Sequence, residues 1–591
     1  GLGIPAEPLF RSSLWCSDAD ENENKSQFVL CFARLIVSLH KNHSSTMTER
    51  KYPIGIQTFS EIIRNGYVYI DKTDLVWQLA QYAKFIFMSR PRRFGKSLLT
   101  STLESYFRGE RELFEGLKII ELEKEWEQYP VLRLDISTAK GQASAEALRE
   151  RLFYILKEHT DDGYERDKYE NTPGALLEGL IRHAYRKTGK QVVIIIDEYD
   201  APLLDVIHDE NVLEKVRRVM QEFYQPLKAN ERFIKFCFLT GITRLSQLNI
   251  FSTLNNLTNI TLLPRFAALC GITSEELSQQ LSTDIHLLAE SYSCSDIEIA
   301  GKLRTRYDGY HFSEKSPDIY NPYSLLSAFA NQRISNYWFE TGTPTFLIRL
   351  MRQFKFNITD MDDIEATDYS INRPTEAMTT MIPLLYQTGY LTIKDYDRES
   401  EIYKLAIPNQ EVRIGYADGL LPVYAGIEGE DVQTGFALKF WRALKKDDVH
   451  LAMQEMQAYL ASISLTPSPS PKGEGSSYIQ TDNQAKSLST PLALWRGAGG
   501  EALYLIFSML NVYVRTQVRC AGGRTDMVVW MPDTIYVFEL KVNDSAENAL
   551  KQIDEKGYTI PYQAESQKVV KIGVKMNVDT RTVEDWAISI D

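Results

Sequence analysis

Short apolar runs alternate with amphipathic stretches through the first half of the chain. Short runs rich in Val, Ile, Leu and Phe begin near positions 84, 131, 191 and 234, and each of the first three is followed by a segment whose apolar residues recur with helical spacing. Buried strands that alternate with helices are typical of a parallel sheet with crossover helices. This pattern predicts an α/β core over residues 47–270. Thr172 and Pro173 suit the N-cap and first position of one covering helix.

The pattern changes beyond this core. Residues 271–460 are richer in helical periodicity and aromatic side chains, and within them residues 384–409 predict a helix that leads into a pair of strands, as in a small winged module. Residues 461–500 are rich in Pro, Gly and Ser without periodicity, which predicts a disordered insertion. A helical stretch and consecutive strand-like runs then predict a smaller α/β domain over residues 501–591.

Composition narrows the class of protein. The 591 residues are enough for several cores, and 44% are apolar and 25% charged. No apolar run reaches the length that crosses a bilayer, so we expect no membrane association and a cytoplasmic protein. The six cysteines contain no CxxC pair, which disfavours a disulfide framework and a structural zinc site. A net charge of -13 restricts any nucleic-acid contact to a local basic patch.

Residues 1–46 are predicted to lie outside the fold. The chain opens with Gly1, and its first Met is Met47, which we expect to be the start of the folded protein. The apolar stretch at 28–39 contains Arg34 and follows acidic residues, so it fits a signal peptide poorly.

A candidate nucleotide site lies in residues 90–97, RPRRFGKS, between a predicted strand and a predicted helix. A P-loop needs glycine so that backbone N–H groups face phosphate oxygens, a Lys for the terminal phosphates and a Ser or Thr hydroxyl for magnesium. Gly95, Lys96 and Ser97 supply these groups. Arg90 stands where the usual motif has its first glycine, so the motif is a variant that includes Arg90 in the cofactor-binding loop. The alternative is an ordinary strand-to-helix turn with a solvated lysine.

The apolar run that begins near position 191 ends in two carboxylates. Asp197 is suited to hold magnesium through water and Glu198 to polarise the attacking water, which are the carboxylate roles that phosphoryl transfer requires. Together with the P-loop they predict ATP and Mg²⁺ as cofactors. The next strand-like run ends in Thr240 and is followed by Arg244, which is either a catalytic arginine for the transition state or a plain surface residue.

A second group of chemically active residues lies near the C-terminus. Asp526 begins one predicted strand, and Glu539 and Lys541 share one face of the next because side chains alternate along a strand. Two carboxylates and a lysine can bind magnesium and orient a hydroxide for phosphodiester cleavage. The alternative is an exposed salt bridge on an edge strand. Further candidates lie on the helices predicted before and after these strands, namely Glu501, Gln552 and Tyr558.

At these residues the chain resembles a bacterial family in which an AAA-ATPase-like domain precedes a domain of the PD-(D/E)XK nuclease superfamily. The resemblance covers roughly residues 52–572, apart from the insertion, and that family also has RPRRFGKS in its P-loop. Its segments occur here in the same order and include YVYIDKT, RPRRFGKSLL, IIIDEYDAPL, LTGITRLS, YDGYHF, YNPYSLL, YWFETGTP, GGRTDMVV and FELK. The resemblance implies nucleotide and magnesium roles for Lys96, Ser97, Asp197 and Glu198, and a nuclease-like centre of Asp526, Glu539 and Lys541.

Three functions agree with these patterns. The first is an ATP-binding P-loop ATPase coupled to a magnesium-dependent nuclease-like domain that acts on nucleic acid, with DNA favoured. The second is an ATP-dependent regulatory switch whose nuclease-like domain binds without cleaving. The third is a damaged member of a mobile gene family. Many ATPases of this class form rings, so a homo-oligomer is a further expectation, although the sequence does not assign Arg244 to a neighbouring subunit.

Overall fold

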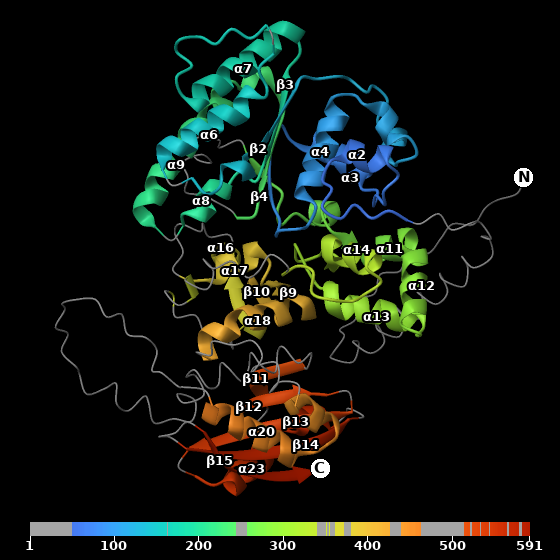
Figure 1. Cartoon of the computed structure of the whole chain (residues 1–591), viewed down its shortest axis with the longest axis vertical. Coiled ribbons are helices and arrows are strands. Elements are labelled where there is room, and N and C mark those ends of the chain that lie inside the picture. The colour runs from blue at the N-terminus through green and yellow to red at the C-terminus, as the bar shows by residue number, and fades with distance from the viewer. Residues whose placement is uncertain are drawn as a thin grey trace, which may run out of the picture.

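The computed structural model of the chain describes most positions between residues 50 and 590, and its groups of elements follow one another along the longest axis (Figure 1). The predicted extension, most of the insertion and the helix expected near position 501 lie outside the described residues. The described residues are 50–142, 144–161, 163–207, 209–243, 257–339, 350–351, 354, 361–371, 380–425, 439–462, 513–520, 523–531, 533–542, 544–563, 567–577 and 582–590.

The first group is built on a five-stranded sheet with the strand order β2-β3-β4-β1-β5. All of its pairings are parallel, which confirms the predicted P-loop type of α/β core. The last, two-residue strand was not predicted. The strands are β1 Phe85–Ser89, β2 Val131–Asp135, β3 Val192–Asp197, β4 Ile234–Gly241 and β5 Thr258–Asn259.

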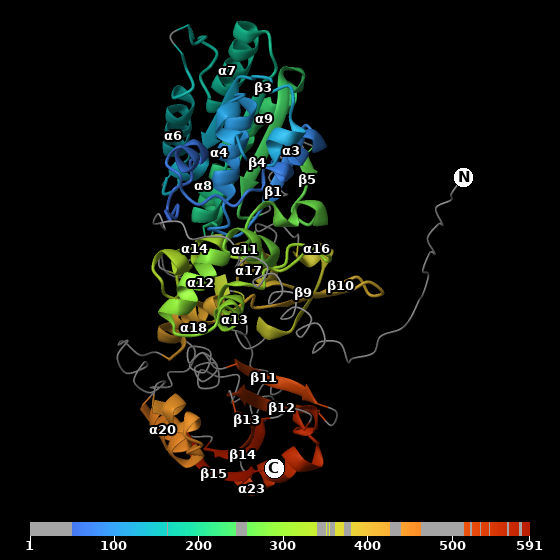
Figure 2. The ribbon, with the colours of Figure 1, turned by 90° about the vertical axis from the view of Figure 1, so that its right-hand side faces the viewer.

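Helices cover both faces of this sheet, as Figures 1 and 2 show. Val193 and Ile195 of β3 pack in the core that contains α4, whereas Val192 and Ile194 pack in the core that contains α6, α7 and α9. This alternation follows from the two-residue period of a strand. The predicted cap of α7 is present, because the Thr172 hydroxyl accepts from the N–H of Ala175. The helices are α2 Phe59–Arg64, α3 Thr73–Tyr82, α4 Lys96–Phe107, α5 Ile119–Leu122, α6 Ala145–Lys157, α7 Pro173–Thr188, α8 Ala201–Asp205 and α9 Glu210–Ala229, with 3-10 turns η1 Arg111–Phe114, η2 Ile136–Ala139, η3 Glu231–Phe233 and η4 Pro264–Leu269.

The middle group is mainly helical, as predicted, and also contains two small sheets. As expected, α17 leads into the antiparallel pair β9 and β10, which a third strand, β8, extends in the order β8-β10-β9. The β6 and β7 strands form the second small sheet. The elements are β6 Ile272–Thr273, α11 Ser274–Gln280, α12 Ser282–Ser291, α13 Asp296–Tyr307, β7 Ile319–Tyr320, α14 Pro322–Ala330, β8 Ile364–Thr367, α16 Asp368–Ile371, α17 Ile382–Thr388, β9 Thr392–Asp397, β10 Ile402–Ala406 and α18 Gln410–Ala425.

The C-terminal group is an α/β unit whose five strands run in chain order, β11-β12-β13-β14-β15. Only β13 and β14 are parallel, and α23 crosses between them on one face of the sheet. The opposite face packs against α20, in which the amide of Gln457 donates to the carbonyl of Val583 at 2.8 Å. The elements are α20 Val449–Ser462, β11 Tyr513–Cys520, β12 Gly523–Trp530, β13 Thr534–Val542, α23 Ala546–Glu555, η8 Ile560–Tyr562, β14 Lys568–Met576 and β15 Val583–Ile590. Among the described residues, no helix combines the length and apolarity that crossing a bilayer requires.

Candidate functional site

The P-loop joins β1 to α4 at the carboxyl edge of the parallel sheet. Gly95 is the N-cap of α4 and has φ 86°, a left-handed conformation that glycine adopts at little cost. The side chain of Lys96 is buried, with 5% exposed, and its Nζ donates to the carbonyl oxygens of Arg90 at 3.1 Å and Pro91 at 3.0 Å. Lys96 is therefore enclosed by the loop, which argues against an ordinary turn with a solvated lysine.

The acidic end of β3 lies against the start of α4. The Oδ2 atom of Asp197 accepts from the Thr100 hydroxyl at 3.4 Å, and its Oδ1 accepts from the Glu198 N–H at 2.9 Å. Burial raises the pKa of Asp197, while a hydrogen bond from Ser97 and the charge of Lys96 oppose that rise. Burial also lowers the pKa of Lys96, against the attraction of Glu198 and Asp197. The structure thus brings Lys96, Ser97 and Asp197 together, as the motif predicts for an ATP and magnesium site.

Glu198 is held beside this group by a lysine that sequence reasoning missed. Its Oε2 lies 2.6 Å from Nζ of Lys140, which follows η2 at the end of β2. Burial alone would raise the pKa of Glu198, but the ion pair with Lys140 keeps that pKa below its usual value. Glu198 also has φ 48°, which is uncommon for a residue with a side chain. The structure therefore supplies an ionised carboxylate next to the loop.

Asp200 is a second residue that the motif analysis did not assign. Its Oδ2 accepts from the backbone N–H of Thr243 at 2.6 Å and from the Thr243 hydroxyl at 2.7 Å, so it ties the end of β3 to the end of β4. The sequence DEYD at 197–200 could have revealed this residue, because Asp200 is a third acidic residue after Asp197 and Glu198. Thr240 is buried at the end of β4. Arg244 lies outside the described residues, and its catalytic role stays a prediction.

Arg90 serves the loop in a different way from a phosphate ligand. Its guanidinium is 1% exposed and donates to the carbonyl oxygens of Ser89 and Thr261, each at 2.9 Å. It also donates to the carbonyl of Phe266 at 3.2 Å and lies 4.3 Å from the centre of the Phe312 ring. The side chain of Arg90 thus fixes the loop to η4 and to the middle module, the group of elements from β6 to α18. The backbone carbonyl oxygen of Arg90 accepts from Lys96.

The middle module holds the rest of the P-loop segment. The Arg93 guanidinium donates to the carbonyl of Tyr337 at 2.9 Å, and the Trp338 indole N–H donates to the carbonyl of Arg92 at 3.3 Å. Oε1 of Glu411, on α18, accepts from the N–H of Tyr337 at 2.7 Å and of Trp338 at 3.0 Å. A chain of hydrogen bonds therefore links α18 to the phosphate-binding loop across more than three hundred residues of sequence.

Replacing Glu411 by glutamine should flatten the pH dependence of this contact. Burial raises the pKa of Glu411 from its ordinary 4.5 to about 7. Between these two pH values Glu411 binds a proton when it is buried against Tyr337 and Trp338, and it releases that proton when the contact opens. The free energy that holds the contact closed should therefore fall as the pH rises from about 4.5 to about 7, by up to about 3 kcal/mol. Glutamine keeps the accepting oxygen and removes the titration.

Hydrogen exchange of the Tyr337 and Trp338 amides, corrected for the intrinsic rate at each pH, measures this effect. In the native chain the protection factors of both amides should drop across the window, whereas in Glu411→Gln they should stay level. The same slope in both proteins would show that Glu411 does not govern the contact.

The C-terminal centre is formed where β12 meets β13. These strands pair Met527 with Phe538, so Asp526 lies opposite Glu539 one position further along. Oδ2 of Asp526 accepts from the Leu540 N–H at 2.8 Å. Asp526 and Glu539 are 6% and 4% exposed, and β13 is the central strand of its sheet. These facts exclude the alternative of an exposed salt bridge on an edge strand.

A hydrogen-bond network joins Glu539 and Lys541 through Gln552 of α23. The amide of Gln552 donates to Oε1 of Glu539 and accepts from Nζ of Lys541, and that Nζ lies 4.0 Å from the same Glu539 oxygen. The amide of Gln552 also lies 3.3 Å from the hydroxyl of Tyr558. Tyr558 was predicted on the same helix, but α23 ends at Glu555 and Tyr558 follows Gly557, whose φ of 63° turns the chain.

The residues present fit a divalent cation. Burial and the neighbouring Asp526 raise the pKa of Glu539 to about 8, with Lys541 opposing that rise. Oε2 of Glu539 is buried without a hydrogen-bond partner among the described residues. An orphaned carboxylate oxygen next to a second carboxylate matches the oxygen ligands that Mg²⁺ prefers. No group of three or more His, Cys, Asp or Glu suited to a metal occurs in the described part of the chain, and Glu501 lies outside it.

Comparisons with known proteins agree with a P-loop domain in the first half of the chain and a nuclease-like domain at its C-terminal end. Residues 53–251 match a family model described as a predicted AAA-ATPase, and residues 501–586 match one for the PD-(D/E)XK nuclease superfamily. An uncharacterized protein in the vnfD 5' region of Azotobacter chroococcum mcd 1 is 30% identical over 550 residues, covering 92% of this chain and 99% of that protein.

Two solved structures give weak likenesses. The ORC2 protein of Aeropyrum pernix, solved as ADPNP and ADP complexes, has 14% identity and a TM-score of 0.22, covering 64% of this chain and 93% of that chain. The ORC1 protein of the same organism, solved in complex with DNA, has 11% identity and a TM-score of 0.22, covering 61% and 96%. The family models and the Azotobacter relative carry the assignment instead. The chain belongs to the bacterial family in which a predicted AAA-ATPase domain precedes a PD-(D/E)XK nuclease superfamily domain.

Proposed function

We propose that the chain binds and hydrolyses ATP at its P-loop and thereby controls magnesium-dependent cleavage of nucleic acid, with DNA favoured, at its C-terminal centre. The observation that carries the proposal is the pair of buried carboxylates Asp526 and Glu539 with the half-buried Lys541 beside them, in the same chain as a buried Lys96 beside Asp197. Buried charged groups with shifted pKa values gather at sites that need them for chemistry. The cytoplasmic location and homo-oligomeric state remain part of the proposal.

At the P-loop, each side chain has a task in phosphoryl transfer. Lys96 neutralises the terminal phosphates of ATP, and the N-terminus of α4 offers its N–H groups to their oxygens. Ser97 and Asp197 would hold Mg²⁺, which when bound neutralises charge on the phosphate oxygens. Glu198 orients the attacking water and accepts its proton, a task for which its ionised state is suited.

At the C-terminal centre, the two carboxylates and the lysine divide the work of phosphodiester hydrolysis. Asp526 and Glu539 would hold Mg²⁺, which when bound lowers the pKa of a water molecule and stabilises charge on the phosphate. Lys541 would orient the attacking water and offset the negative charge that develops on the phosphate oxygens. Gln552 positions both Glu539 and Lys541 through its amide.

A second function is favoured by the contacts between the P-loop and the middle module. Because Tyr337 and Trp338 bind the loop at Arg93 and Arg92, ATP in the loop is expected to change how this module is held. This coupling between ATP and the middle module would suit a regulatory switch whose nuclease-like domain binds nucleic acid without cutting it.

Incubating supercoiled plasmid, single-stranded DNA and single-stranded RNA with the full chain distinguishes these functions. The first function predicts cleavage in Mg²⁺ with ATP and none in excess chelator. Binding of DNA and hydrolysis of ATP without cleavage in Mg²⁺ or Mn²⁺ would favour the switch. If the protein neither binds nor cuts DNA or RNA, both functions are wrong.

A further inference from the structure

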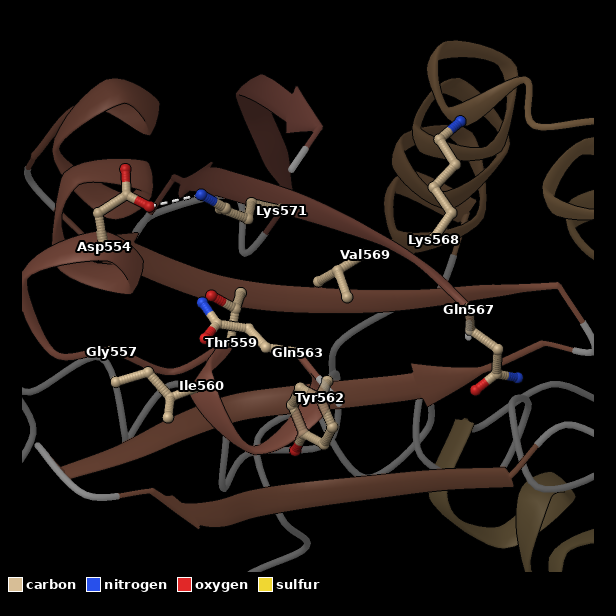
Figure 3. Close-up of a pocket in the computed structure, with 10 residues that line it drawn as sticks. All are labelled: Asp554, Gly557, Thr559, Ile560, Tyr562, Gln563, Gln567, Lys568, Val569 and Lys571. Carbon is tan, nitrogen blue, oxygen red and sulfur yellow. Dashed lines mark hydrogen bonds and ion pairs between the residues drawn. The ribbon is translucent and has the colours of Figure 1, made fainter. Parts of the chain in front are cut away.

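Two lysines line a pocket of about 440 Å³ between the end of α23, the turn that follows it and the first half of β14 (Figure 3). Nζ of Lys571 donates to Oδ1 of Asp554 at 2.6 Å, and Nζ of Lys568 lies 2.7 Å from Oδ2 of Asp447. Each of these lysine charges is therefore balanced by a carboxylate of the protein itself. Within the described residues, the guanidinium of Arg92 in the P-loop has no carboxylate at ion-pair distance.

The P-loop segment RPRRFGKS contains three arginines, and two of them hold the loop in place. Arg90 is buried and donates to backbone carbonyl oxygens. Arg93 donates to the carbonyl of Tyr337, and its guanidinium carbon lies 3.9 Å from the centre of the Tyr323 ring. Arg92 is exposed, and its guanidinium forms no hydrogen bond in the part of the chain that the structure describes. Arg92 is thus the arginine of the loop that remains available to a ligand.

The backbone of Arg92 is fixed although its guanidinium is not. Its carbonyl accepts from the indole N–H of Trp338 at 3.3 Å. Pro91, just before it, packs so closely on Gly389 that a Cβ atom there would lie 2.7 Å from the Cβ of Pro91. Arg93, just after it, has φ 64°, a left-handed conformation that is uncommon for a residue with a side chain. The side chain of Arg92 therefore projects from a rigid point of the loop.

This point lies beside the groups that are expected to surround the terminal phosphate. The carbonyl of Pro91 accepts from Nζ of Lys96 at 3.0 Å, and the Cα atom of Arg92 follows that of Pro91 by about 3.8 Å. Burial would raise the pKa of Glu198, but Lys140 and other nearby cations, Arg92 among them, keep it below its usual value. Arg92 thus starts near the ammonium of Lys96, and its charge reaches the carboxylate of Glu198.

Hydrolysis of ATP creates a need for a further cation at this place. The water oxygen forms a bond to the terminal phosphorus, the bond from that phosphorus to the bridging oxygen breaks, Glu198 takes the water proton, and ADP leaves with the electron pair. Negative charge shifts among the phosphate oxygens during this step, and a positioned arginine stabilises it. Arginine suits this task because its charge is permanent and its N–H donors form a planar fork that matches phosphate oxygens.

We propose that Arg92 is a catalytic residue of ATP hydrolysis, whose guanidinium donates to oxygens of the terminal phosphate of ATP and stabilises the charge that develops there. The inference rests on the proposed function, because it takes ATP in the P-loop as its starting point. It gives the site an arginine from its own loop, so that this stabilisation requires neither Arg244 nor an arginine from a neighbouring subunit.

Binding of a fluorescent ADP analogue to the full chain in Mg²⁺, with and without aluminium fluoride, tests this role. Aluminium fluoride beside ADP mimics the phosphoryl group in transfer, so a residue that stabilises that group raises the affinity for the pair and not for ADP alone. Arg92→Met should reduce the gain in affinity from aluminium fluoride by about tenfold or more. It should also lower kcat for ATP by about a hundredfold or more, while the affinity for ADP stays within about twofold of the native value.

A conservative variant and a control accompany this measurement. Arg92→Lys keeps the charge without the forked donors, so it should recover part of the gain from aluminium fluoride and part of kcat. Arg218→Met is the matched control, because Arg218 is 73% exposed on α9 and pairs with Glu214 of the same helix. It should behave as the native chain does in all three measurements.

The affinity for ADP separates a catalytic role from a structural one. Loss of ADP binding in both Arg92→Met and Arg92→Lys would overturn the proposal, since it would show that Arg92 holds the loop. A native kcat together with a native gain from aluminium fluoride in Arg92→Met would also overturn it, and would leave ATP hydrolysis at the P-loop standing. Absence of ATP binding and hydrolysis in the native chain would overturn the proposed function itself.

Discussion

Replacing Lys96 by methionine should lower kcat/KM for ATP hydrolysis by at least about a hundredfold. The ammonium of Lys96 is enclosed by the loop, where it contacts two carbonyl oxygens and where phosphate charge would otherwise be uncompensated. Methionine retains the length and apolar stem of lysine without the charge. Phosphate release measures hydrolysis, and a fluorescent ATP analogue measures binding in the same samples.

The matched control for this variant is Lys84→Met. Lys84 lies just before β1, in the same domain, and its ammonium donates to the backbone carbonyl of Glu231 at 2.8 Å, away from the loop. This control should retain ATP hydrolysis within about twofold, because surface contacts of this kind contribute little. Equal hydrolysis by Lys96→Met and Lys84→Met would show that the P-loop is not the nucleotide site.

Replacing Asp526 by asparagine should abolish cleavage of DNA, with a loss of at least about a hundredfold in rate. Asparagine retains an oxygen that can accept from the Leu540 N–H, so the β12–β13 contact is preserved while the negative charge is lost. The centre would then present Glu539 alone to Mg²⁺. Cleavage rate over a range of Mg²⁺ concentrations, and Mg²⁺ binding by calorimetry, are the two measurements.

Asp533→Asn serves as the control for this second prediction. Asp533 is exposed in the turn between β12 and β13, and it uses its backbone carbonyl to accept from Lys568. The control should cut DNA at the native rate. Unchanged cleavage in Asp526→Asn would remove Asp526 from the centre and with it the assignment of the metal site.

Strands β1 to β4 and β11 to β13 of the two main sheets could be predicted because their signals are local. The run that forms β3 is continuously apolar because both of its faces are covered, and Thr172 with Pro173 marks a helix start by local hydrogen bonding. The short strands β5 to β8 were missed, since two to four residues are too few to show a period. The last two strands of the C-terminal sheet, β14 and β15, were not predicted either. Helix α20 was assigned by its place in the sequence to the middle module, yet it packs on the C-terminal sheet.

The site residues likewise fall into those that a local sequence pattern reveals and those that only long-range contacts reveal. Lys96 and Ser97 were found because they belong to a short motif between a strand and a helix, and Asp197 because it ends a continuously apolar run. Lys140 could not be found, because its pairing with Glu198 joins residues 58 positions apart and belongs to no short motif. The contacts of Trp338 and Glu411 with the P-loop segment are more distant still. They depend on how the middle module folds against the loop, which no local pattern encodes.

The most direct test of the central claim is a time course of plasmid cleavage in Mg²⁺, with and without ATP, for the native chain, Lys96→Met and Asp526→Asn. We predict that ATP changes the cleavage rate of the native chain, that Lys96→Met cuts at one rate whether or not ATP is present, and that Asp526→Asn does not cut while it still hydrolyses ATP. Cleavage by the native chain that is identical with and without ATP would contradict the coupling of the two sites.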